Sequence, residues 1–375
     1  MKILFWTEVF WPHIGGAEIF CLNLYKSLRD RGHELILITD LNRPNLAERA
    51  EVEGLPVYRL PFREGLTGKV DQLAYAKKRV AALKEEFHPD LIHLHTYGPA
   101  SIFHVESQQR RRIPTLMTLH VHPNFSLKPG SDFLNYLTRS IDGFSAVSSS
   151  VFAEGAEYFP DPSLKKYCIV NAIPEPTKVP EPATSHEPAC LLSLGRMVSE
   201  KGFKTALQAF SRLAETFPDL KYVIAGDGPD LAALKGEANR LGIASRVDFR
   251  GWVAPQDIPA LMAESAMVLV PSEWEEPFGL VALEAAHLGK AVVATRSGGL
   301  PEIVMEGETG RLVEKGKADE MAQAVADLLH DPEMTQAMGR RARKRAREVF
   351  PYEPMVDRYE RAYAEILAAA PRKSL

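Results

Sequence analysis

The chain has few features of a membrane protein, a disulfide-rich protein or a nucleic-acid binder. It carries only three cysteines among 375 residues, and Cys21, Cys168 and Cys190 are widely spaced. They lack the spacing of metal ligands and fit a reducing compartment with buried thiols. No stretch approaches the roughly 18 consecutive apolar residues of a membrane-spanning helix. The formal net charge is −4, whereas nucleic-acid binders are normally basic.

The N-terminal residues lack the pattern of a secretory signal. Their apolar run ends at Glu8, and no small-residue cleavage site follows. We therefore expect a cytoplasmic protein, with peripheral contact at the inner face of a membrane as an alternative. A length of 375 residues favours two domains.

Short apolar runs alternate with helical patterns such as Ala17–Arg31 and Val70–Phe87. The first half predicts strands at Lys2–Thr7, Glu34–Thr39, Asp90–His95, Pro114–His120 and Gly143–Ser148. The second half predicts strands at Cys190–Leu194, Tyr222–Ala225, Val247–Arg250, Met267–Val270 and Ala291–Thr295. Runs that are apolar on both faces indicate parallel sheets covered by helices on each side, hence an α/β fold with two doubly wound, Rossmann-like domains.

A proline-rich stretch separates the two halves, because five of the fifteen residues from Pro174 to Pro188 are prolines. Proline opposes both helix and sheet and favours an extended spacer. We predict a first domain at residues 1–176, a linker at 177–188 and a second domain at 189–351. Ligands of open α/β sheets bind at the carboxyl ends of the strands, so the chemistry is expected there.

Two cations follow the first strand of the second half. The strand Cys190–Leu194 runs into Gly195, Arg196 and then Lys201 before a helix. Fixed cations near a helix N-terminus suit a diphosphate and the charge that develops as it leaves. The alternative is a pair of solvated surface cations.

A second glycine-containing turn, with Gly226 and Gly228, follows the strand Tyr222–Ala225. The third glycine of a dinucleotide fingerprint is absent, because Leu231 occupies its place. A tight strand-to-helix turn explains this pattern better than a cofactor loop does.

The most informative segment is Pro271–Ala285, in which a strand leads to a Pro/Ser loop and then to a helix. Glu276 lies at the edge of the loop and Glu284 lies inside the helix. The backbone N–H groups of Phe278, Gly279 and Leu280 are expected to be free for an anion. Ionised carboxylates nearby would accept hydrogen bonds from hydroxyl-rich groups. The alternative is an ordinary helix with acidic residues in its first turns.

Glycines also open the first helix of the chain. Gly15 and Gly16 follow the first strand and precede Ala17 and Glu18. Glycines at this place let a phosphate or sugar approach the backbone closely, and a plain turn is the alternative.

In this combination the chain resembles glycosyltransferase family 4, which are retaining enzymes of the GT-B fold. The resemblance rests on the segments Gly195–Gly202, Gly226–Pro229, Glu276–Ala285 and Gly298–Glu302, in the family's order and spacing. It is specific over residues 190–315 and looser before them. It implies two facing domains with a deep cleft between them, the first taking the acceptor and the second the donor. A C-terminal helix near 352–370 would pack back on the first domain.

The resemblance also implies roles for the matching residues. Arg196 and Lys201 would bind the donor diphosphate, Glu276 the hydroxyls of the transferred sugar, and Glu284 the ribose. The Gly15–Gly16 loop would close over the donor.

A histidine near the reacting sugar is a further feature of the family, and His120 at the end of a predicted strand matches it. His122 is the weaker candidate. His93, His95 and His104 are interpreted as structural. His93 and His95 share one strand face without an evident third ligand, so no metal site is predicted.

We therefore predict a metal-independent, retaining transfer from a nucleotide-diphosphate sugar to a glycan, a lipid-linked acceptor or a small molecule, without a further cofactor. In the front-face mechanism proposed for such enzymes, the departing phosphate oxygen takes the acceptor proton. A covalent path through Glu276 is the alternative mechanism. A GT-B-like epimerase or phosphorylase and a non-catalytic nucleotide-sugar sensor are the alternative functions. A nicotinamide dehydrogenase is disfavoured by the incomplete glycine pattern.

A basic segment remains to be explained. Six of the eight residues from Arg340 to Arg347 are cationic, and on a helix they would surround it. A solvated helix or contact with the other domain is the plainer interpretation. Binding to an anionic membrane surface or a lipid-linked acceptor is the alternative.

Overall fold

The chain forms two units in a computed structural model, which describes residues 1–13, 15–43, 45–110, 112–123, 128, 130–176 and 189–369. The first unit comprises Met1–Val170 together with Glu353–Leu375, and the second comprises Asn171–Tyr352. The predicted first domain extended to residue 176, but Glu175 pairs with Arg343 and Arg347 of the second unit. The boundary therefore falls earlier than the sequence indicated. The predicted linker at 177–188 lies outside the described residues.

The first unit contains an eight-stranded sheet in the order β3-β4-β2-β1-β5-β6-β7-β8. Its strands are β1 Lys2–Trp6, β2 Glu34–Asp40, β3 Arg49–Val52, β4 Leu55–Leu60, β5 Leu91–Leu94, β6 Thr115–Leu119, β7 Gly143–Ala146 and β8 Lys165–Cys168. All neighbours are parallel except β3 and β4. Every residue of β5, β6 and β7 is buried, as a parallel sheet covered on both faces requires.

Helices connect these parallel strands. They are α1 Gly16–Asp30, α2 Phe62–Leu66, α3 Val70–Phe87, α4 Ala100–Arg110, α5 Asp132–Ser140 and α6 Ser149–Tyr158. Two of them begin at a serine whose side chain accepts a hydrogen bond from the first turn, Ser131 for α5 and Ser148 for α6. Such caps satisfy N–H groups that have no partner within the helix.

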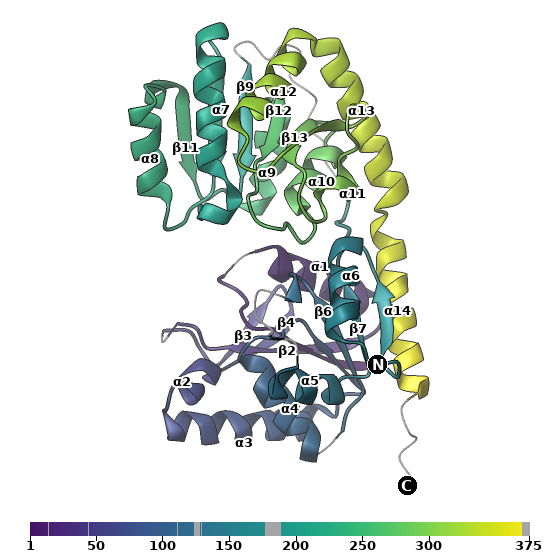
Figure 1. The fold of residues 1–375 in the computed structure, drawn as a ribbon. Helices are drawn as coiled ribbons and strands as arrows, with labels where there is room; N and C mark the ends of the chain where they lie inside the picture. Colours follow the sequence, from purple (N-terminus) through teal and green to yellow (C-terminus); the bar gives the residue numbers. More distant parts are fainter. Residues whose placement is uncertain are drawn as a thin grey trace. The chain divides into compact units, whose positions relative to one another are not determined.

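The last helix, α14 (Tyr352–Ala369), completes the first unit although it follows the second in sequence (Figure 1). Arg31 at the end of α1 forms ion pairs with Glu353 at 2.5 Å and Asp357 at 2.7 Å, and also with Glu360. Further along α14, the hydroxyl of Tyr363 lies 2.7 Å from Nδ1 of the buried His93 on β5. Charged contacts at one end and a buried polar contact in the middle hold α14 on this unit.

The second unit contains a six-stranded parallel sheet in the order β11-β10-β9-β12-β13-β14. Its strands are β9 Cys190–Leu194, β10 Lys221–Ala225, β11 Val247–Gly251, β12 Met267–Val270, β13 Ala291–Thr295 and β14 Gly310–Val313. Its helices are α7 Phe203–Thr216, α8 Leu231–Arg240, α9 Ile258–Glu264, α10 Leu280–His287, α11 Leu300–Ile303, α12 Ala318–His330 and α13 Pro332–Val349.

The main core of this unit lies where α7, α8 and α12 pack on the sheet. Phe210 of α7, Tyr222 of β10 and Met321 of α12 are fully buried there. None of the helices in the described residues is long and apolar enough to cross a bilayer. The chain reverses between β9 and β12 in the strand order, and this switch point is where open α/β sheets bind their ligands.

Candidate functional site

Two predicted site residues of the second unit form a direct ion pair. Nζ of Lys201 lies 3.1 Å from Oε1 and 2.8 Å from Oε2 of Glu276. Lys201 ends a short 3₁₀ turn, Ser199–Lys201, after β9, and Glu276 lies in the loop after β12. Because β9 and β12 are neighbours in the sheet, loops distant in sequence meet at its carboxyl edge.

The carboxylate of Glu276 is buried and fully engaged. Oε2 also accepts hydrogen bonds from Ser272 Oγ at 2.8 Å and Trp274 Nε1 at 3.0 Å. Burial by itself raises the pKa of Glu276, but the charge of Lys201 and these hydrogen bonds outweigh it, so the pKa lies below its ordinary value. Glu276 is therefore ionised at neutral pH, in the form that accepts hydrogen bonds from hydroxyl groups.

Close backbone packing holds these loops in place. At Gly202 (φ 67°) an added Cβ would lie 1.9 Å from the carbonyl oxygen of Pro271. At Gly298 (φ 50°) an added Cβ would lie 2.0 Å from the carbonyl oxygen of Glu276. Any side chain would push the loops apart, so glycine is required at both positions.

The start of α10 offers backbone donors. Gly279 is the N-cap with φ 106°, and no side chain caps the helix. The N–H groups of Phe278, Gly279 and Leu280 have no hydrogen-bond partner within the described part of the chain. The side chain of Phe278 is buried against Phe350, so its backbone is the part that a ligand can reach.

Arg196, unlike Lys201, makes no ion pair with a described residue. Its side chain is exposed, and it has no ion pair or hydrogen bond to any described residue. An unpaired guanidinium at the carboxyl edge of β9 can bind a phosphate in a bidentate manner at little cost to the protein's own contacts.

Glu284 lies on α10 without a side-chain partner among the described residues. Burial of the carboxyl raises its pKa to about 7, although its side chain is not fully closed off from solvent. A carboxylate held in this state gains a partner only when a hydroxyl-bearing ligand reaches it.

The other predicted glycines are explained by packing between loops. The N–H of Gly195 donates to the carbonyl oxygen of Ala225 at 3.0 Å, and that of Gly226 donates to Gly251 at 2.7 Å. An added Cβ at Gly226 would lie 1.9 Å from the carbonyl oxygen of Gly195. These N–H groups are already used, so both glycines bring the loops together rather than offer donors to a ligand.

In the first unit, Gly15 caps α1, and Gly16 is the first residue of that helix. An added Cβ at Gly15 would lie 2.7 Å from the Glu18 carboxylate. Beside this turn the unit holds a cavity of about 210 Å³, lined by residues that follow β1, β5 and β6 and by the first turns of α1. Among the lining residues are Glu8, Glu18, Cys21, His95 and His120.

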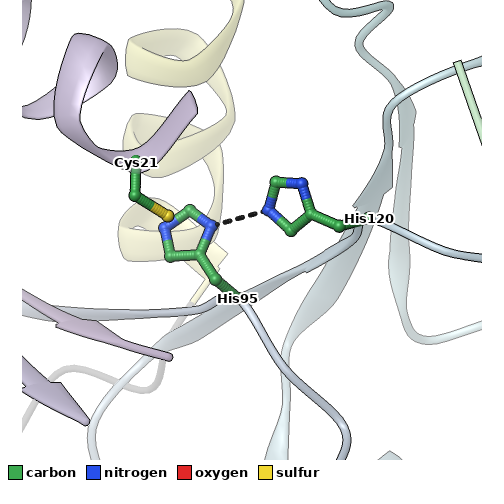
Figure 2. Close-up of side chains that lie close together, drawn as sticks. All are labelled: Cys21, His95 and His120. Atoms are coloured by element: carbon green, nitrogen blue, oxygen red, sulfur yellow. Dashed lines mark hydrogen bonds between the residues drawn. The ribbon is translucent and has the colours of Figure 1, made fainter. Parts of the chain in front are cut away.

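His120 follows β6 and lines this cavity together with His95, which follows β5 (Figure 2). Nε2 of His120 lies 3.0 Å from Nδ1 of His95, and desolvation lowers the pKa of His120 to about 3. The ring is therefore neutral at physiological pH, and one of the two histidines donates to the other.

Three other histidines considered in the sequence analysis, His93, His104 and His122, have structural partners. His93 is enclosed, with Nε2 at 2.6 Å from Thr118 and Nδ1 bonded to Tyr363. His122 pairs with Glu154 at 2.6 Å. His104 is buried, with Nε2 3.4 Å from the carbonyl oxygen of Ser140. These contacts agree with the structural interpretation of His93 and His104, whereas His95 lies beside His120 in the cavity.

The chain matches two family descriptions that together span most of its length. Residues 14–174 match "Glycosyltransferase Family 4", and residues 175–345 match "Glycosyl transferases group 1". N-acetyl-alpha-D-glucosaminyl L-malate synthase of Bacillus anthracis is 30% identical over 379 residues, covering 95% of this chain and 96% of that protein. The chain belongs to glycosyltransferase family 4. A glycosyltransferase of Methanocaldococcus jannaschii is 25% identical over 98% of this chain and 99% of its own length.

Solved structures share the fold of this glycosyltransferase. Sucrose-phosphate synthase from Thermosynechococcus elongatus has a TM-score of 0.83 at 21% identity and covers 99% of this chain and all of its own. Anabaena HepE, solved with UDP-glucose, has a TM-score of 0.79 at 23% identity and covers 97% of this chain and all of its own. The predicted GT-B fold is confirmed.

Sequence reasoning did not single out Glu8 in this glycosyltransferase. Oε2 of Glu8 accepts a hydrogen bond from the N–H of Ala100 at 3.0 Å and from Thr96 at 3.4 Å. Burial raises the pKa of Glu8, although Ala100 and Arg63 oppose this effect. Its position directly after β1, at the carboxyl edge of the sheet, was the available signal.

The basic segment of this glycosyltransferase is part of α13, and four of its cations have partners in the second unit. Arg343 and Arg347 pair with Glu175, Arg341 donates to the carbonyl oxygen of Glu308, and Arg345 donates to that of Glu302. These contacts lie within the second unit, so they match neither the solvated helix nor the contact with the other domain that the plainer interpretation named. Membrane contact stays a prediction that would depend mainly on Arg340 and Lys344.

Proposed function

We propose that this chain transfers a glycosyl group from a nucleotide-diphosphate sugar to an acceptor hydroxyl, with retention at the anomeric carbon. The observation that supports this most directly is the Lys201–Glu276 pair, two residues before the free N–H groups of Phe278–Leu280. A cation and oriented backbone donors suit a leaving diphosphate, and an ionised buried carboxylate suits sugar hydroxyls.

In this proposal the bond between the anomeric carbon and the diphosphate oxygen breaks while the acceptor oxygen bonds to the same face of that carbon. The acceptor proton passes to the departing phosphate oxygen, so no protein base is needed. Arg196 and Lys201 stabilise the diphosphate, and Glu276 orients the sugar. Glu284 accepts from the ribose. His120 is assigned to the reacting sugar, and the Gly15–Gly16 turn to the donor phosphates.

The proposed chemistry is metal-independent because protein cations and backbone N–H groups supply the positive charge. The names of the relatives suggest which donors to test first, since one relative makes an N-acetylglucosaminyl product and the HepE structure holds UDP-glucose. We propose a uridine nucleotide as the donor's leaving group.

Thermal stabilisation by UDP, GDP, ADP and NAD tests the donor assignment. A ligand that binds only the folded state at 100 times its Kd stabilises it by about 2.7 kcal/mol. A shift with UDP that disappears in Arg196→Ala supports the proposal. A rise in melting temperature with NAD alone would contradict the transferase proposal and favour a dehydrogenase.

Product analysis tests the reaction itself. The protein is incubated with UDP-sugars and with L-malate, a glycan or a lipid-linked acceptor, because the first relative's name contains malate. NMR coupling at the new anomeric centre distinguishes retention from inversion, and an inverted product would contradict the mechanism. A sugar product formed without any acceptor would indicate an epimerase. If UDP binds tightly but the nucleotide-diphosphate sugar is not consumed, the protein would be a non-catalytic nucleotide-sugar sensor.

A further inference from the structure

We infer that Cys21, His95 and His120 form a binding site for a thiophilic divalent transition metal, of which Zn²⁺ is the typical example. One ligand atom from each of the three residues lies within 4.8 Å of the other two. The proposed transfer uses no metal, but this site shares His120 with the residues assigned to the reacting sugar. The inference about binding does not depend on the proposed function.

The distances suit a small tetrahedral ion. Nδ1 of His95 and Nε2 of His120 are 3.0 Å apart. Two nitrogens bound to Zn²⁺ at about 2.0–2.1 Å in tetrahedral geometry lie about 3.3 Å from each other. An ion bound to both nitrogens would lie off the line that joins them, so the two rings would turn toward it as they separate by a few tenths of an ångström. The proton now held between the rings would move to the other nitrogen of the ring that carries it.

The backbone holds the three residues in place. His95 and His120 directly follow β5 and β6, which are neighbours in the sheet. The N–H of His95 donates to the carbonyl oxygen of Trp6 at 2.7 Å, which joins it to β1 as well. Cys21 lies in the second turn of α1, and Figure 2 shows its sulfur close to the His95 ring. Ligands on regular elements give a site that needs little reorganisation.

Two of the three side chains are shielded from solvent. Cys21 is 0% exposed and His95 is 6% exposed. Binding would replace the thiol proton of Cys21 by a sulfur–metal bond and release that proton to solvent.

Nδ1 of His95 faces His120, whereas Nε2 of the same ring is buried without a partner among the described residues. When Nδ1 binds the ion, Nε2 carries the proton of the neutral ring. The cavity of about 210 Å³ beside the three residues gives room for an ion and water. Glu8 and Glu18 line the same cavity, so a carboxylate or a water can complete the coordination.

A consequence for activity rests on the proposed role of His120. A metal bound to His120 would occupy the ring assigned to the reacting sugar. Zn²⁺ would therefore inhibit the transferase, and removing Cys21 would weaken the inhibition without removing His120.

The experiment measures Zn²⁺ binding to the chelator-treated full chain against a chromophoric competitor, and Co²⁺ binding by absorption. The variants are Cys21→Ser, Cys21→Ala and His95→Gln, with Cys168→Ser as the matched control. We expect one tight site with a sulfur-to-cobalt charge-transfer band. The affinity should fall at least about 100-fold in both Cys21 variants and stay unchanged in the control. Circular dichroism verifies that each variant is folded.

Equal Zn²⁺ affinity in the wild type and both Cys21 variants would overturn the inference, as would a cobalt spectrum without the sulfur band. The thiol would then be only a small apolar side chain in the core. The activity assay separates the claim that the three residues bind a metal from the claim that His120 acts at the reacting sugar. Tight binding without inhibition would support the metal site and contradict the role of His120. Inhibition of equal strength in the wild type and the Cys21 variants would contradict the metal site.

Discussion

Lys201 bridges both carboxylate oxygens of Glu276, with its Nζ 2.8 Å from Oε2 and 3.1 Å from Oε1. The cation also lies 5.2 Å from the centre of the Trp274 ring. Because Glu276 is buried and Lys201 is its only described cationic partner, the pair carries both a structural and a proposed chemical role.

Replacing Lys201 by Met should leave the Glu276 carboxylate buried without a cation. The free energy of unfolding at pH 7 should fall by about 2 kcal/mol, below the value for a fully buried pair because 27% of the Lys201 side chain is exposed. Transfer activity should fall as well. Chemical denaturation measures the stability, and Lys204→Met on the exposed face of α7 is the control.

The same pair predicts a pH dependence with a definite sign. The folded-state pKa of Glu276 is lowered, so its ion pair stabilises the protein above the ordinary carboxyl pKa and loses this effect as the pH falls through the folded value. The stability difference between the wild type and Lys201→Met should therefore be largest near pH 7 and narrow below pH ~4. A difference that grows on acidification would contradict this assignment.

Arg196→Ala should separate binding from stability. The side chain is exposed and has no described partner, so the melting temperature without ligand should not change. Loss of a charge-assisted hydrogen bond of about 1.5–3 kcal/mol should weaken nucleotide binding about 10- to 100-fold. Calorimetric titration with UDP measures this change in nucleotide affinity. Arg212→Ala on α7 is the control, and an equal loss in that variant would show a non-specific charge effect.

Glu284→Gln should stabilise the free protein while weakening nucleotide binding. Burial raises the pKa of Glu284 from 4.5 to about 7, so ionising it costs stability as the pH rises through this window. The gain in melting temperature should be near zero at pH 4, grow between pH 4.5 and 7, and stay constant above. Glu215→Gln on the exposed side of α7 is the control, and a gain that does not depend on pH would contradict the explanation.

Tyr363→Phe should loosen α14. The change removes the 2.7 Å hydrogen bond to His93 and leaves a buried ring nitrogen without it, which costs about 1–3 kcal/mol. The urea midpoint of the first unit should fall, whereas Tyr136→Phe, at a residue that is 53% exposed, should not change it. Equal midpoints for the wild type and Tyr363→Phe would mean that the bond contributes nothing.

The sequence predicted the strands that are buried on both faces. Cys190–Leu194, Met267–Val270 and Ala291–Thr295 have the same bounds in the structure, because such strands are continuous apolar runs. It missed β3, β4, β8 and β14. β3 reads Arg-Ala-Glu-Val with no buried residue, and β4 contains Pro56, so only their pairing with each other and with β2 makes them strands.

The candidate functional site could also be predicted only in part from the sequence. Arg196, Lys201 and Glu276 could be named from strand-to-helix loops, but the pairing of Lys201 with Glu276 joins residues 75 positions apart. His95 was interpreted as structural because no third ligand follows it locally. Its neighbours Cys21 and His120 come from other elements, and only the order of the strands brings them together.

The chain leaves the first unit after Val170 and returns to it at Glu353, so the second unit is an insertion within the first. On the ribosome the second unit is therefore complete before α14 emerges, and the surface of the first unit that Tyr359 and Tyr363 cover stays open until α14 has been made. The same connectivity joins the second unit to the first through two junctions, one after Val170 and one before Glu353.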